Sequence, residues 1–118
     1  MNAMTYDVEI VLRERNFAVT ERLRHASEPQ AWTERDVESV LKEILLAIDR
    51  VKNPEAADRY VALRGFSWIV EPTEGGVVIA IEIPIGAAVA GPFGIDQARL
   101  DGMITRVLAS ARPPAVVH

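Results

Sequence analysis

Apolar and polar residues alternate near the start of the chain. Tyr6, Val8, Ile10 and Leu12 would share one face of a strand, with charged residues opposite them. A period of two predicts a half-buried strand over residues 5–13. The same pattern resumes at 17–23 after a turn at Asn16 and favours a second strand, although residues 21–26 could equally form a helical turn.

The longest periodic segment follows a loop at residues 27–30. Its apolar positions recur at helical spacing: Val37, Val40, Leu41, Ile44, Leu45, Ile48 and Val51. This stripe predicts an amphipathic helix. Thr33 can cap the helix, and Asp36 stands three residues later as in a capping box. Trp32 and Val37 occupy hydrophobic-staple positions, which favours packing over ligand stacking for Trp32. Leu46 falls opposite the stripe. Either it is a single exposed leucine, or it contacts a partner chain.

A second, shorter helix is predicted after Asn53. Asn53, Pro54 and Glu55 have the order of a cap, a proline at the first helical position and an acid near the helix N-terminus. The helix would run towards Leu63 and end at Gly65. Residues 60–63 could instead form a strand.

A hairpin is predicted from residues 66–71 and 77–83, joined across 73–76. A four-residue loop pairs Pro72 with Val77, and it gathers the apolar side chains on one face: Phe66, Trp68, Val70, Ile79, Ile81 and Ile83. A three-residue loop pairs Pro72 with Gly76 and leaves apolar residues on both faces, which calls for a second cover such as another subunit. We favour the four-residue loop because it separates polar from apolar residues.

The most unusual segment is a glycine-rich apolar stretch at residues 84–95, which we expect to be a loop. Its candidate ligand- or partner-binding residues are Gly86, Val89, Gly91, Pro92, Phe93 and Gly94. The segment matches no phosphate-binding motif and has no lysine or arginine. In one interpretation it packs across the sheet with Phe93 in the core. In the other it is an exposed flap over a ligand or another chain. We favour the first.

The last predicted helix begins after a cap at Asp96 and stops at Pro113 and Pro114. Its buried side comprises Leu100, Met103, Ile104, Val107, Leu108 and Ala111. The elements predict a single α+β domain over residues 1–112 with a tail at 113–118. The fold class is a two-layer sandwich, in which an antiparallel sheet of about four strands carries two main helices on one face, in the order β-β-α-(α)-β-β-α.

Composition narrows the function classes. The 118 residues are 49% hydrophobic, which excludes a disordered acidic chain. Without cysteine there is neither a disulfide framework nor a thiolate metal site. The net charge of -4, together with Glu14 and Glu21 inside the most basic stretch, argues against nucleic-acid binding.

Residues 77–95 hold a single charge, Glu82, and resemble a membrane span in hydropathy alone. Their β-branched residues favour a strand, and Pro84 and Pro92 would interrupt a helix, so we expect no membrane segment. Met1 to Tyr6 lacks the basic and apolar regions of a secretory signal, which together with the lack of cysteine suggests the cytoplasm.

Groups suited to catalysis are scarce. His25 and His118 are the only histidines and show no zinc-ligand spacing, so neither a metal nor a cofactor is expected. No serine lies in a nucleophile-elbow motif. Glu82 would suit acid–base chemistry if burial raised its pKa, but the favoured hairpin register turns it to solvent.

These observations favour a small cytoplasmic interaction or assembly module that self-associates as a homodimer and has no catalytic activity. The alternative is a small-molecule-binding domain or modest enzyme with a pocket between sheet and helices, closed by the 84–95 loop. There an arginine such as Arg64 could hold a small acidic ligand.

Overall fold

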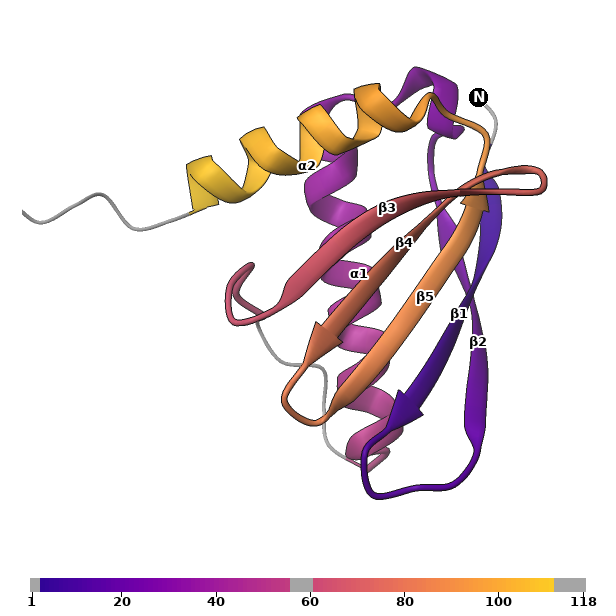
Figure 1. Cartoon of the computed structure of the whole chain (residues 1–118), viewed down its shortest axis with the longest axis vertical. Coiled ribbons are helices and arrows are strands. Elements are labelled where there is room, and N and C mark those ends of the chain that lie inside the picture. The colour runs from indigo at the N-terminus through magenta and orange to yellow at the C-terminus, as the bar shows by residue number, and fades with distance from the viewer. Residues whose placement is uncertain (1–2, 56–60, 112–118) are drawn as a thin grey trace, which may run out of the picture.

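A computed structural model describes residues 3–55 and 61–111 of the chain. Its elements, in chain order, are β1 (Met4–Leu12), β2 (Ala18–His25), a short 3-10 turn (Pro29–Ala31), α1 (Glu34–Lys52), β3 (Ser67–Thr73), β4 (Gly76–Ile83), β5 (Gly86–Phe93) and α2 (Gln97–Ala111). The strands form one antiparallel sheet in the order β2-β1-β5-β4-β3. Both helices lie on the same side of this sheet (Figure 1). The fold is therefore the predicted α+β two-layer arrangement, with five strands rather than about four.

The first two strands form a hairpin. Val8 pairs with Glu21 and Ile10 with Val19, so β2 is a strand and the helical alternative for residues 21–26 is wrong. Tyr6, Val8 and Ile10 are buried, as their alternation predicts.

The second hairpin joins β3 to β4 in the predicted register. Pro72 pairs with Val77 and Thr73 with Gly76, which leaves Glu74 and Gly75 at the turn. As a result Val70, Ile79 and Ile81 are buried, whereas Ser67, Glu71 and Glu82 are exposed. The exposure of Glu82 removes the condition under which it would suit acid–base chemistry.

The glycine-rich segment is a strand, and its prediction as a loop is wrong. Strand β5 lies in the middle of the sheet and pairs with β1 on one side and β4 on the other. Small residues are required there: a Cβ on Gly86 would collide with the Val11 carbonyl oxygen. Ala88 and Ala90 point inward and are buried, in a strand that α1 contacts. The glycine and alanine residues, which are typical of loops, here allow the neighbouring elements to pack closely against a central strand.

Helix α1 begins as predicted. The Thr33 side chain accepts a hydrogen bond from the Asp36 backbone, and the Asp36 carboxylate accepts one from the Thr33 backbone, which completes a capping box. Trp32 is 1% exposed, so the packing interpretation is confirmed. Leu46 is half-buried rather than exposed, and it no longer indicates a partner contact.

Asn53 is the C-cap of α1, where we expected it to begin a second helix. Most of that predicted short helix, residues 56–60, lies outside the described part of the chain. The flanking residues 53–55 and 61–66 are not helical, and residues 61–63 are not strand. The tail expected at 113–118 also lies outside the described residues.

The core fills the space between the inner face of the sheet and the two helices. Phe93 is fully buried, and its ring centroid lies 5.0 Å from that of Trp32 and 5.1 Å from that of Tyr6. Asp96 caps α2 by accepting a hydrogen bond from the Arg99 backbone. Over residues 3–55 and 61–111, no helix is long and apolar enough to cross a membrane.

Candidate functional site

The six candidate residues of the glycine-rich segment do not form one site. Phe93 and Gly86 are buried, which supports the packing interpretation for this part of the segment. Val89 is 42% exposed and lies on the sheet face away from the helices. Gly91 is half-buried, while Pro92 and Gly94 are exposed near the end of β5. Only Val89 therefore belongs to an exposed apolar surface.

That surface, which we call the outer patch, crosses four strands of the sheet on its open face. It consists of Val11, Ile69, Ala80, Ala87 and Val89. Its three larger members are 43%, 53% and 42% exposed for Val11, Ile69 and Val89 respectively. The alanines are too small to fill the space between them, and a shallow hollow of about 370 Å³ runs along β3, β4 and β5. Contiguous exposed apolar surface of this kind is typical of interaction sites.

Charged residues of opposite sign flank the outer patch. The β2 side of the open face carries Arg22 and Arg24, whereas Glu71 and Glu82 stand on β3 and β4 at the other side. Arg22 contacts Asp7 of β1 at 3.0 Å. The β2 edge of the face is thus basic and the β3 side is acidic. Between them the apolar residues share the face with Asp7 and Glu9 of β1, and Glu9 lies opposite Val89.

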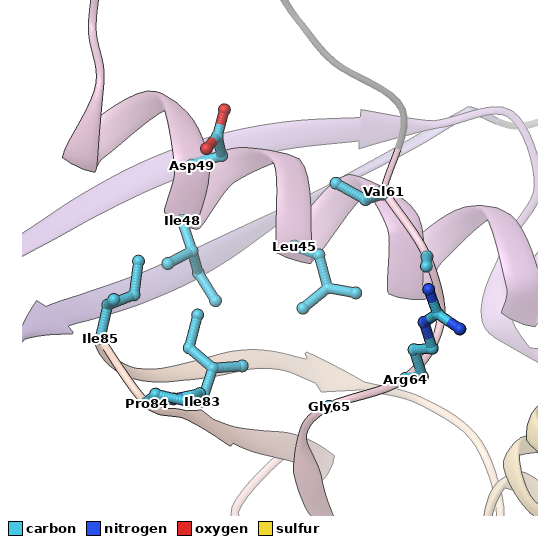
Figure 2. Close-up of a pocket in the computed structure, with 10 residues that line it drawn as sticks. Leu45, Ile48, Asp49, Val61, Arg64, Gly65, Ile83, Pro84 and Ile85 are labelled. Atoms are coloured by element: carbon cyan, nitrogen blue, oxygen red, sulfur yellow. The ribbon is translucent and has the colours of Figure 1, made fainter.

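A second hollow, which we call the end pocket, lies between α1, the segment 61–65 and the β4–β5 turn (Figure 2). Its volume is about 600 Å³. Its apolar side chains are those of Leu45, Ile48, Val61, Ala62, Ile83, Pro84 and Ile85. Arg64 and Asp49 are its charged neighbours. The end pocket thus corresponds to the predicted pocket between sheet and helices. Of the 84–95 segment that was expected to close it, only the turn at residues 84–85 borders the pocket, because residues 86–93 form a strand.

A buried polar cluster is the feature that sequence reasoning missed. His25 is 7% exposed, and its two ring nitrogens lie 3.1 Å from carboxylate oxygens of Asp36 and Glu43. Tyr6 donates a hydrogen bond of 2.7 Å to the other oxygen of Glu43. The Trp32 ring packs edge-on against the imidazole, 5.8 Å between centroids. The protonated ring can donate to both carboxylates, whereas the neutral ring can donate to only one.

The electrostatics of this cluster favour a charged Asp36 carboxylate and a neutral Tyr6 phenol. Burial raises the pKa of Tyr6, and its hydrogen bond to Glu43 raises it further. Burial alone would raise the pKa of Asp36, but hydrogen bonds from the Thr33 backbone, His25 and the Thr33 hydroxyl together hold it below its usual value. The cluster ties β1, β2 and α1 together.

The sequence contained one signal for this cluster. Asp36 and Glu43 are seven residues apart, two helical turns, and therefore lie on one side of α1. Which strand residue they would meet depends on how the helix crosses the sheet. Across the described ranges, no group of three or more His, Asp or Glu residues is arranged to hold a metal ion.

Comparison of the chain with protein-family models, with curated proteins and with solved structures finds no match.

Proposed function

We propose that the protein is a cytoplasmic assembly module that forms a symmetric homodimer by packing the open faces of two sheets against each other. The observation that carries this proposal is the outer patch, which exposes Val89 on the central strand β5, with Val11 on the adjacent strand β1 and Ile69 on the edge strand β3, on the sheet face that bears no helix. A second copy would cover these side chains and fill the hollow over Ala80 and Ala87.

The size of the open face fits such an interface. Five strands about 4.8 Å apart, each about eight residues long, span a face of roughly 25 Å by 25 Å. A standard protein–protein interface buries about 800 Å² of accessible surface on each partner, and the corrugated surface of such a face has that order of area. Aligned packing of two sheets is also a common way to bury a sheet face.

Charge complementarity favours a second copy over an unrelated partner. Consider a two-fold axis that runs between the two sheets, parallel to the strands. It would bring β2 of one copy over β3 of the other, so that Arg22 and Arg24 of each copy would face the acidic side of its partner near Glu71. Each of these contacts would occur twice, as an isologous interface requires.

The test is sedimentation of the full chain at micromolar concentration. The wild type is expected to sediment at twice the 13.0 kDa of the single chain. Val89→Glu would put a carboxylate of each copy beside the two-fold axis at the centre of the interface, and the variant is expected to be a monomer. Phe17→Glu is the matched control, because Phe17 is 60% exposed but precedes β2, outside the outer patch, and this variant should remain a dimer.

A charge exchange tests the orientation of the two copies. Arg24→Glu alone should weaken the dimer, and combining it with Glu71→Arg in the same chain should restore it. A wild-type chain that sediments at 13.0 kDa would refute the dimer. A dimer that survives Val89→Glu would refute the outer patch as its interface.

A further inference from the structure

The end pocket has the size and lining of a small-molecule site. Its volume of about 600 Å³ lies within the roughly 300–1,000 Å³ that is typical of ligand pockets. Figure 2 shows Leu45 and Ile48 of α1 pointing across the space towards Ile83 and Ile85 at the β4–β5 turn. The interior is therefore aliphatic, and it suits a hydrocarbon chain rather than a polar metabolite.

One cation stands at the rim of this pocket. Arg64 is exposed, and within the described part of the chain its guanidinium has no hydrogen-bond or ion-pair partner. Its neighbours hold its backbone in place, since Leu63 is buried in the core and Gly65 turns the chain with a φ of 79°. A positioned and unpaired guanidinium can hold a carboxylate through two parallel hydrogen bonds.

The nearby acid does not compete for that role. Asp49 accepts a hydrogen bond of 3.3 Å from the Asn53 side chain. Its carboxylate points away from the interior of the pocket, on the far side from Arg64 (Figure 2). The pocket thus combines an apolar interior with a positive charge on one side of its mouth.

We infer that the end pocket binds an amphipathic monocarboxylate, with its aliphatic chain between α1 and the β4–β5 turn and its carboxylate on Arg64. The ligand class follows from the two halves of the site: the aliphatic lining favours burial of a hydrocarbon chain, and the Arg64 guanidinium at the mouth favours a carboxylate over an uncharged head group. The site lies apart from the outer patch, so this inference does not rest on dimer formation.

Decanoate, below its micelle-forming concentration, is the probe, and binding is followed by calorimetry and by backbone amide chemical shifts. Saturable binding is expected, with shifts at Val61, Arg64 and Ile83. Arg64→Gln should weaken binding at least ten-fold, and decanol should bind the wild type at least ten-fold more weakly than decanoate. Ile85→Ser, at a side chain that is 39% exposed, should also weaken binding without unfolding the protein.

Arg35→Gln is the matched control, because Arg35 is an exposed arginine in the first turn of α1, at the other end of the helix from the pocket, and it should bind like the wild type. Three outcomes would overturn the inference: no saturable binding, equal affinity for decanoate and decanol, or unchanged affinity in Arg64→Gln. Repeating the titration on Val89→Glu separates the two proposals, since a monomeric variant that still binds decanoate leaves the pocket intact.

Discussion

His25 meets Asp36 and Glu43 although 11 and 18 residues of sequence separate it from them. Seen alone in the sequence, each has an ordinary role: a single histidine near a turn, a helix-capping acid and a surface glutamate. Their contact arises because His25 lies on the inner face of β2, where α1 crosses it. A buried imidazole between two carboxylates is stable only as a complete set, since removing one member leaves the others desolvated and unpaired.

His25→Ala is therefore expected to destabilise the fold by about 2 kcal/mol, because two carboxylates would face each other without a donor between them. Tyr6→Phe removes only the hydrogen bond to Glu43 and should cost about 1 kcal/mol. Urea denaturation monitored by tryptophan fluorescence measures both. Equal stability of His25→Ala and the wild type would show that the cluster does not hold α1 to the sheet.

The lowered pKa of Asp36 predicts a specific dependence of stability on pH. A carboxyl group whose pKa is depressed in the folded state stabilises the protein above its unfolded pKa of 3.8, and this contribution is lost as the pH falls through the folded value. The stability difference between the wild type and Asp36→Asn should thus be constant near neutral pH and shrink below about pH 4. Denaturation curves between pH 2 and pH 7 test this, and a difference that grows towards acid would contradict it.

Among the elements, α1 and the β3–β4 hairpin could be predicted from the sequence, and β5 could not. The stripe and capping box of α1, and the separation of polar from apolar residues that selects the Pro72–Val77 register, are local patterns. Strand β5 lacks such a pattern, because its small residues are required by close packing against strands that are distant in the sequence. Gly86 is needed only because β1 passes so closely beside it.

Gly86→Ala should therefore destabilise the protein by roughly 1–3 kcal/mol, because the added methyl group overlaps the Val11 carbonyl in the middle of the sheet. Gly94→Ala is the control, since a Cβ at Gly94 has no neighbour within 4 Å, and it should change stability by much less. Thermal unfolding of the two variants side by side makes the comparison. If they proved equally stable, close packing would not explain the glycine in β5.

For the whole molecule, the two helices cover one face of the sheet, and the outer patch remains on the other. If a second copy covers this patch, folding and association are linked, and the midpoint of thermal unfolding should rise with protein concentration. Val89→Glu should abolish that dependence, whatever its own stability. Calorimetry over a hundred-fold range of concentration tests this, and a wild-type midpoint that does not move would contradict the dimer.

The sequence by itself determined the α+β class, the first strand, the long helix with its cap, the register of the second hairpin and the last helix. These follow from alternation, helical spacing and capping, which act over a few residues. The tertiary structure decided that the glycine-rich segment is the central strand and that His25 lies between two acids. It also decided that Arg64 stands beside an apolar pocket. Each of these depends on which segments, distant in the sequence, pack together. A local pattern of residues does not specify such contacts.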